Sequence, residues 1–250
     1  MTKVALICGT DLRQYAGLEL TEELSLTSEY GEVSSTVFKS SLFNNDVFFM
    51  ARHGVNSSIA PHQINYRANI DVLGQLGVEQ IIAVNTVGGL HDSMAPGTWV
   101  CPEQIIDYTY GREQTFFDGL HKPMKHIDFS FPFAHSLRDS MIDYANQVGM
   151  PMSHFGTYAV TQGPRLETAA EVRRLQRDGC DLVGMTMMPE AVLARELDIG
   201  YCSLCLVANW GAGMEKQPLD IDAIYALVKA GFTDVVSFLS DYLKQLESSK

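Results

Sequence analysis

The chain has 250 residues, of which 46% are hydrophobic and 19% charged, a composition that indicates a folded globular protein and excludes a disordered one. Acidic residues number 30 against 18 lysines and arginines, so the net charge is −12. A surface this acidic argues against binding of nucleic acid or of an anionic membrane through bulk charge. A small anion can still bind where a few basic groups converge.

The sequence gives no sign of export or of membrane insertion. It has no run of eighteen uncharged apolar residues, and the apolar stretch before Gly9 is too short for a signal peptide. Five cysteines, an odd number, indicate reduced thiols, so we expect a cytoplasmic protein. Cys202 and Cys205 form a single C-x-x-C within an apolar, strand-like run, where they face opposite sides. We expect buried thiols there and no metal site.

Apolar runs typical of strands alternate with helical patterns along the chain, without a linker or an internal repeat. The expected strands are 4–8, 33–40, 46–51, 80–85, 98–107, 155–160, 182–184 and 200–208. The expected helices are 61–76, 133–148, 166–177, 189–197 and 222–246. Several strands are continuous apolar runs, as in sheets covered on both faces. The pattern predicts a single α/β domain over residues 1–250, with a central twisted mixed sheet flanked by helices.

Residues 108–131 are less regular and rich in aromatic residues and histidine. In a compact domain such a segment is typical of a site loop or of a contact between subunits. A loop folded over its own core is the alternative.

Polar groups follow three of the expected strands. Gly9-Thr10 offers backbone amides and a hydroxyl, Arg52-His53-Gly54 offers hydrogen-bond donors for an oxyanion, and residues 85–89, Asn-Thr-Val-Gly-Gly, offer Thr86 and small residues. Because open α/β sheets bind ligands at the carboxyl ends of their strands, these groups predict an anion site. With neither a G-x-G-x-x-G motif nor a Walker A lysine, free phosphate is favoured over a dinucleotide or nucleoside triphosphate. Ordinary turns and a surface arginine are the structural alternative.

Three further polar residues follow apolar segments in the second half: Glu167, Thr186 and Asn209. Each has a structural explanation of its own. Glu167 suits the first turn of a helix, Thr186 suits a helix cap, and Asn209 suits a turn. These explanations do not account for the repeated placement of a polar group after an apolar stretch.

Taken together, these segments resemble the purine nucleoside phosphorylase and methylthioadenosine phosphorylase family. The stretches that carry the resemblance are Gly9-Thr10, Arg52-His53-Gly54, residues 61–70, residues 85–90, residues 163–167, residues 183–190 and Asn209. They occur in the family's order and span nearly the whole chain. The resemblance implies a nucleoside-phosphorylase-like fold, a homotrimer, and phosphorolysis of a purine nucleoside. Inorganic phosphate is then a co-substrate, and no metal or organic cofactor is needed.

The resemblance also assigns roles to particular residues. Those that match phosphate-site positions are Thr10, Arg52, His53, Thr86 and Thr186. Those that match the substrate site are Met185 beside the ribose, and Leu166, Glu167, Asn209 and the adjoining Trp210 at the base. His126 matches a histidine that the methylthio branch sends into the neighbouring subunit's site. Ser57 stands where that branch usually has histidine.

The base pocket favours a 6-oxopurine. Glu167 can accept from N1–H, while the Asn209 amide can donate to O6 and accept from a protonated N7. Adenine reverses this polarity, and a site built for one polarity rejects the other strongly. Adenosine-preferring relatives carry Asp-Tyr-Asp where this chain has Asn209-Trp210-Gly211.

The group at the nucleoside 5′ position follows from Ile221, which stands where ordinary relatives have a histidine for a 5′-hydroxyl. Ile221 and Ile224 would form an apolar wall for a methylthio group, unless they are ordinary core positions of the last helix. The expected reaction is therefore S-methyl-5′-thioinosine plus phosphate to hypoxanthine plus S-methyl-5-thioribose 1-phosphate, a purine salvage step. A general inosine/guanosine phosphorylase, a methylthioadenosine phosphorylase and a non-catalytic nucleoside-binding protein remain as alternatives.

Overall fold

The computed structural model describes residues 2–43, 46–120, 122–215 and 221–248. In this part of the chain eleven strands form one mixed sheet. The strands are β1 (Val4–Cys8), β2 (Leu20–Leu24), β3 (Val37–Ser40), β4 (Val47–Ala51), β5 (Gln80–Gly89), β6 (Trp99–Val100), β7 (Gln104–Asp107), β8 (Met152–Ser153), β9 (Thr157–Val160), β10 (Leu182–Gly184) and β11 (Gly200–Trp210). The helices are α1 (Tyr66–Gln75), α2 (His135–Val148), α3 (Ala169–Arg177), α4 (Met187–Glu196) and α5 (Ile221–Ser248).

The centre of the sheet is parallel. β1 lies between β4 and β5, and β5 in turn pairs with β11 over its whole length. The end of β5 also pairs with β10 in the antiparallel sense, so the sheet is mixed, as expected. β2 and β3 extend one edge, and β9 and β7 extend the other. Because β1, β4 and β11 run parallel to β5, their carboxyl ends meet at the same end of the strands, beside the second half of β5.

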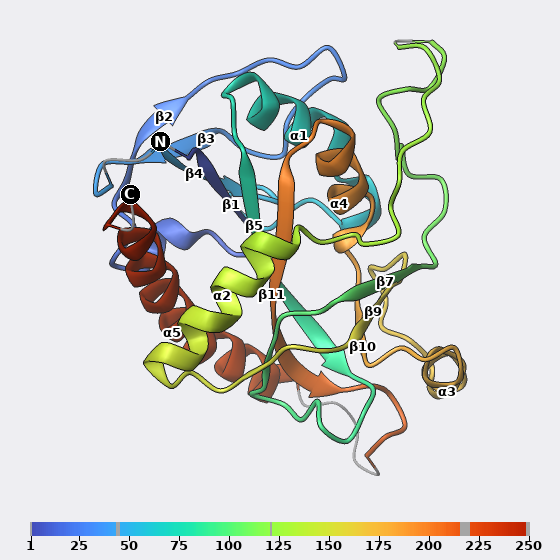
Figure 1. Cartoon of the computed structure of the whole chain (residues 1–250). Helices are drawn as coiled ribbons and strands as arrows, with labels where there is room; N and C mark the ends of the chain where they lie inside the picture. The colour runs from blue at the N-terminus through green and yellow to red at the C-terminus, as the bar shows by residue number, and fades with distance from the viewer. Residues whose placement is uncertain (1, 44–45, 121, 216–220, 249–250) are drawn as a thin grey trace.

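Helices cover both faces of the sheet (Figure 1). Ala5 and Ile7 of β1 lie in the core formed with α1 and α4, whereas the alternate residues Leu6 and Cys8 lie in the core formed with α2 and α5. All five β1 residues are buried, which confirms the prediction from the continuous apolar run. The expected α/β architecture is correct.

Several predicted boundaries are wrong. β5 continues through Asn85 and Thr86 to Gly89, and β11 continues to Trp210, because the two strands pair side by side along ten residues or more. The expected strand 98–107 is two short strands, β6 and β7. β2 and β8 lie outside every expected strand.

The helix starts also differ from the prediction. α1 begins at Tyr66, because the Asn65 side chain accepts from the Ala68 amide and caps the helix there. α3 begins at Ala169 and not at residue 166, because Thr168 and Glu171 form a reciprocal capping box. Glu167 therefore precedes the helix and is not part of its first turn. α4 begins at Met187, two residues before the expected Pro189 start.

By length and composition alone, α5 is a candidate for crossing a membrane. Its burial gives its apolar residues another explanation. Phe232, Val235, Leu239 and Leu243 are buried in the core that α5 forms with the sheet and α2. α5 is thus an amphipathic helix of the globular core.

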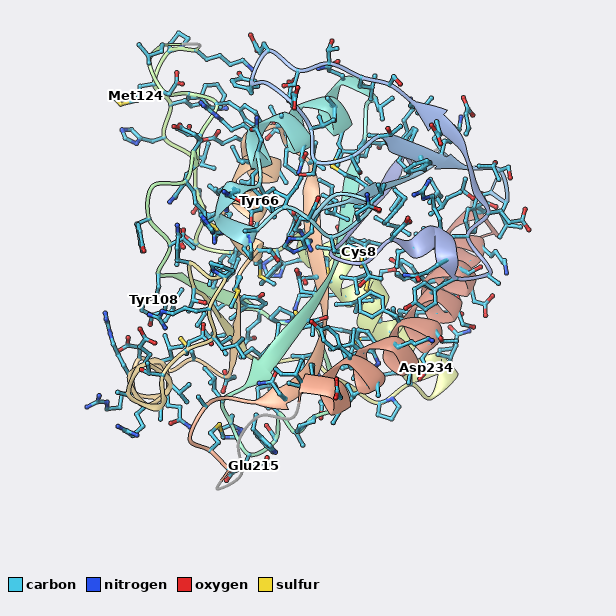
Figure 2. All side chains as sticks on the ribbon, turned by 180° about the vertical axis from the view of Figure 1, so that it is seen from behind. Cys8, Tyr66, Tyr108, Met124, Glu215 and Asp234 are labelled. Carbon is cyan, nitrogen blue, oxygen red and sulfur yellow. The ribbon has the colours of Figure 1, made fainter. Side chains whose placement is uncertain are left out.

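The described residues of 108–131, all but 121, form an irregular segment that runs outside the helices, with Met124 at the outer edge of the molecule (Figures 1 and 2). Phe116 is fully buried and packs edge-on against Tyr30, with 5.1 Å between the ring centroids. By contrast, Leu120 and Met124 are 89% and 74% exposed. One part of the segment therefore folds over the core, and another part presents apolar side chains to the surroundings.

Candidate active site

A cavity of about 500 Å³ lies at the carboxyl ends of β1, β4, β10 and β11, within the usual range for small-molecule sites. Its lining joins segments from all along the chain: Gly9, Thr10, Arg52, His53, Pro61, Val84 to Gly88, Leu166, Glu167, Val183 to Thr186, Asn209, Gly211, Ala212, Ile221, Ile224, Tyr225, Val228 and Phe232. The parallel strands β1, β4, β5 and β11 bring Thr10, Arg52, Thr86 and Asn209 together, as the sequence predicted, whereas Met185 and Thr186 arrive from β10, which runs antiparallel to β5.

Ten of the twelve predicted site residues line this cavity, and Trp210 and His126 do not. Trp210 follows Asn209 on β11, and successive strand residues point to opposite faces. The side chain of His126 is exposed on the irregular segment. Neither residue therefore belongs to the lining of this cavity.

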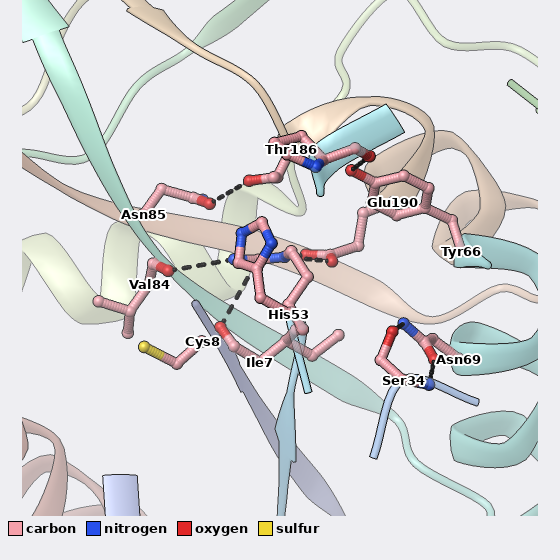
Figure 3. Close-up of polar contacts among 12 residues, drawn as sticks. Ile7, Cys8, Ser34, His53, Tyr66, Asn69, Val84, Asn85, Thr186 and Glu190 are labelled. Carbon is pink, nitrogen blue, oxygen red and sulfur yellow. Dashed lines mark hydrogen bonds and ion pairs between the residues drawn. The ribbon is translucent and has the colours of Figure 1, made fainter. Parts of the chain in front are cut away.

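Arg52 is not the freely available anion ligand that the sequence predicted. Its side chain is 1% exposed and forms a bidentate ion pair with Glu190, at 2.6 Å from Nε to Oε2 and 2.8 Å from Nη2 to Oε1. Nη2 also donates to the Ile7 carbonyl and Nη1 to the Val84 carbonyl, each at 3.4 Å (Figure 3). Within the described residues, these contacts leave one N–H, on Nη1, for a ligand.

The ion pair also fixes the charge at this end of the cavity. Burial alone would lower the pKa of Arg52, but the charge of the Glu190 carboxylate and its hydrogen bonds raise the pKa by more than burial lowers it. Arg52 therefore stays charged. Glu190 is itself buried and accepts a third hydrogen bond from the Tyr201 hydroxyl at 2.9 Å. Glu190 is not among the site residues predicted from the sequence, although a glutamate within the otherwise apolar start of α4 was a usable signal.

His53 is held by its backbone surroundings. Its Nδ1 lies 2.8 Å from the Ile59 carbonyl, and because a carbonyl only accepts, Nδ1 carries the proton. Burial lowers the pKa of His53, so the neutral form is favoured and Nε2 is an acceptor. The expected role of His53 as a donor to an anion therefore holds only for its protonated form.

The hydroxyls at this end differ in what they can donate. Thr186 Oγ1 donates to Asn85 Oδ1 at 2.9 Å (Figure 3), and Asn85 Nδ2 donates to Ser203 Oγ at 2.7 Å. The Thr186 proton is thus already engaged, whereas Thr86 is exposed to the cavity. Ser57 Oγ lies 3.5 Å from the Gly9 carbonyl, at the same end of the cavity.

Two polar side chains are fixed at the other end. Glu167 Oε1 accepts from Thr161 Oγ1 at 2.6 Å, so this carboxylate is held as an acceptor. Asn209 Nδ2 donates to the Trp210 carbonyl at 2.7 Å, which identifies the nitrogen side of the amide and leaves Oδ1 to accept. Thr161 was missed, although it directly follows the apolar strand β9, as the predicted polar residues follow theirs.

Gly211 has a packing reason to be glycine. A Cβ at this position would lie 2.7 Å from Leu90 Cδ2 and 3.2 Å from Val172 Cγ1. The aspartate that adenosine-preferring relatives carry here would not fit without movement of its neighbours.

The start of α5 forms an apolar wall along the cavity. Ile221, Ile224, Tyr225 and Val228 line it at helical spacing. Ile221 is 48% exposed and Tyr225 is 69% exposed, so these are not ordinary core positions. The part of the neighbouring stretch over 217–220 lies outside the described residues. Across the described ranges, no cluster of three histidine, cysteine or acidic side chains has the arrangement of a metal site.

Comparison with known proteins points to one family. The model of the phosphorylase superfamily matches residues 3–245. The chain is 44% identical to a probable S-methyl-5′-thioinosine phosphorylase of Pseudomonas syringae pv. tomato, over 97% of this chain and 99% of that protein. It is 41% identical to a 6-oxopurine nucleoside phosphorylase of Pyrococcus furiosus, over 96% and 91%. A crystal structure of the adenosine/methylthioadenosine phosphorylase of Schistosoma mansoni superposes with a TM-score of 0.90 at 26% identity, covering 99% and 92%.

Proposed function

The chain belongs to the phosphorylase superfamily, and on this premise we propose that it cleaves S-methyl-5′-thioinosine with phosphate, giving hypoxanthine and S-methyl-5-thioribose 1-phosphate. It is an enzyme of the purine nucleoside phosphorylase type, and relatives that act on 6-oxopurine nucleosides support this base preference. The proposed reaction is a purine salvage step and needs no metal or organic cofactor.

The observation that carries the proposal is the fixed polarity of Glu167 and Asn209. Thr161 holds Glu167 as an acceptor, which suits the N1–H of a 6-oxopurine and opposes the N1 lone pair of adenine. The Trp210 carbonyl holds one Asn209 N–H, so Oδ1 can accept from N7–H and the second N–H can donate to O6. Adenine would leave these groups unpaired or opposed, and such mismatches are strongly rejected.

The proposed chemistry follows from this arrangement. A phosphate oxygen attacks C1′ of the ribose as the C1′–N9 bond breaks, and the electron pair of that bond passes to the purine. The charge on the leaving base is relieved by protonation at N7 with the proton that hydrogen phosphate loses, by way of solvent, as it becomes the phosphate ester, and Asn209 Oδ1 accepts the new N–H. Because that hydrogen bond exists only as the bond breaks, it stabilises the transition state more than the substrate.

At the opposite end of the cavity, phosphate would be positioned for attack and not strongly neutralised. Arg52 is already paired with Glu190, so one N–H, the Thr10 and Thr86 hydroxyls and nearby backbone amides are the proposed contacts. Weak neutralisation suits a phosphate that must remain a nucleophile.

The apolar wall of Ile221, Ile224 and Val228 supports a methylthio group at the 5′ position. Each buried methyl-sized group contributes about 0.8 kcal/mol. A 5′-hydroxyl against the same wall would lose a hydrogen bond to water without gaining another.

We also propose a homo-oligomer, most simply a trimer, in which the irregular segment with His126 completes a neighbour's site. The exposed apolar side chains of Leu120, Met124 and Phe131 support a subunit contact there. The five cysteines are unlinked and buried, which fits our proposal of a cytoplasmic location. Light scattering on the active enzyme tests the assembly, and a fully active monomer would refute it.

The function is tested by measuring kcat/KM for methylthioinosine, methylthioadenosine, inosine and adenosine in one phosphate buffer. We expect 6-oxopurine nucleosides to be favoured at least about a hundredfold over their 6-amino partners, with methylthioinosine ahead of inosine. Efficient cleavage of methylthioadenosine would refute the base-pocket argument. Inosine ahead of methylthioinosine would instead indicate a general inosine/guanosine phosphorylase, and binding without phosphate-dependent release of base would indicate a nucleoside-binding protein.

A further inference from the structure

Two walls of the cavity come from separate parts of the chain. The segment that ends in Glu167 follows β9, and the segment with Met185 and Thr186 follows β10. The β9–β10 ladder joins the two segments as far as the Thr161 amide, which donates to the Gly184 carbonyl at 2.8 Å. Beyond this point both have irregular backbone, so the spacing between Gln162 and Met185 depends on other contacts.

One guanidinium bridges the two walls from behind the cavity. Arg112 is 9% exposed and is not among the lining residues. Its Nη1 donates to the carbonyls of Met185 at 2.8 Å and Met188 at 2.6 Å, and its Nη2 donates to those of Thr161 at 3.3 Å and Gln162 at 2.9 Å. The separate nitrogens of the fork thus hold separate walls.

The remaining contact of Arg112 anchors the bridge to the core. Nη1 lies 3.3 Å from the hydroxyl of Tyr66, a buried residue of α1. All of these partners are carbonyl or hydroxyl oxygens, and none is a carboxylate. A lysine cannot reproduce this arrangement, because its ammonium is a single point and not a planar fork.

The bridge is linked through Thr161 to Glu167, the residue proposed to accept a hydrogen bond from the base. Thr161, whose carbonyl accepts from Arg112, donates its hydroxyl to Glu167. We propose that Arg112 is a positioning residue that, through Thr161, fixes Glu167 relative to the Met185–Thr186 wall and thereby sets the discrimination between 6-oxo and 6-amino purines. This inference rests on the proposed function.

Arg112 belongs to the irregular segment, so a purely structural role in tethering that segment is the competing explanation. The chain offers a matched control in Arg67. Its guanidinium also holds this segment, through the Thr115 carbonyl at 3.4 Å and Asp118 at 3.1 Å, but it contacts neither wall of the cavity in any described interaction. Arg67 belongs to α1, so replacing either arginine with lysine is the same chemical change in a side chain that holds the irregular segment.

The test compares the ratio of kcat/KM for methylthioinosine to that for methylthioadenosine in wild type, Arg112→Lys and Arg67→Lys. We expect the ratio to fall at least about tenfold in Arg112→Lys, because a displaced Glu167 no longer accepts a hydrogen bond from N1–H of the base. In Arg67→Lys we expect the ratio to stay within about twofold of wild type. The ratio is independent of the fraction of folded enzyme, so partial unfolding cannot imitate the effect. Arg112→Gln serves for the same measurement where the lysine variant does not purify.

A second pair of variants isolates the link to Glu167. Thr161→Val removes the hydroxyl at nearly constant volume and should lower the ratio, whereas Thr161→Ser keeps the donor and should preserve it. An unchanged ratio in the Arg112 variants, or an equal fall in Arg67→Lys, would overturn the inference while leaving the proposed function intact. A wild-type enzyme without preference for 6-oxopurines would overturn the proposed function, and the inference with it.

Discussion

Glu190→Gln should destabilise the protein severely although it changes one atom of a side chain outside the cavity lining. The Arg52–Glu190 pair is bidentate, both side chains are 1% exposed, and the Tyr201 hydroxyl also depends on Glu190. The variant leaves the Arg52 charge buried without a counter-charge. Breaking such a pair costs about 3–5 kcal/mol. For a chain of 250 residues this corresponds to a fall in Tm of about 6–20 °C.

The assay is denaturant unfolding of wild type, Glu190→Gln, and the double variant with Arg52→Met. The double variant also removes the buried Arg52 charge that Glu190→Gln leaves without a counter-charge. It should therefore be more stable than Glu190→Gln alone. Its glutamine can still accept from Tyr201. Its KM for phosphate should nevertheless rise by about tenfold, the loss of one charge-assisted hydrogen bond of about 1.5 kcal/mol.

Two results would refute this reasoning. A loss of less than about 1 kcal/mol in Glu190→Gln would mean that water reaches the pair and that Arg52 is not confined by it. An unchanged KM for phosphate in the double variant would mean that the remaining Arg52 N–H does not contact the anion.

Three further predictions concern the two ends of the cavity. Glu167→Gln should reduce the preference for 6-oxo over 6-amino nucleosides at least about tenfold, because an amide can donate to adenine N1; steady-state kinetics with both nucleosides measures this. Ile221→Asn should reduce the preference for methylthioinosine over inosine about fivefold, since Ile221 is only half-buried, and an unchanged preference would place the 5′ group elsewhere. Burial lowers the pKa of His53 from its ordinary 6.5, so the unfolded chain takes up the proton first as the pH falls. The stability of wild type relative to His53→Gln should therefore decrease from pH 7.5 to 5.5 in phosphate-free unfolding experiments, and an increase would contradict the neutral, buried state of His53.

The segments of the site could be found from the sequence because they obey a local rule. Thr10 and Arg52 follow β1 and β4, and Asn209 lies near the end of β11, and all three strands are buried and run parallel to β5. A continuous apolar run predicts a strand covered on both faces, and strands of one direction end at one edge. That rule holds without knowledge of any contact.

Contacts between distant residues could not be found in this way. Glu190 lies 138 positions from Arg52 in the chain, and no periodicity links the two. Local capping, not hydrophobic pattern, set the start of helix α3 at Ala169 and left Glu167 outside the helix, where it accepts from Thr161. The polar residues from Asn85 onward predicted the end of a strand, yet β5 continues through them. The Asn85 side chain is buried and forms hydrogen bonds with Thr186 and Ser203.

The sequence by itself determined the α/β class, the covered sheet and the edge at which the polar segments gather, since these follow from hydrophobic period and strand direction. The tertiary structure alone decided which groups at that edge remain able to bind. Arg52 is largely engaged by Glu190, His53 offers Nε2 as an acceptor because its Nδ1–H donates to the Ile59 carbonyl, and Arg112 joins two walls without lining the cavity. The physical reason is that hydrogen-bond donors are few and directional, so their availability is fixed by partners that only folding brings within reach.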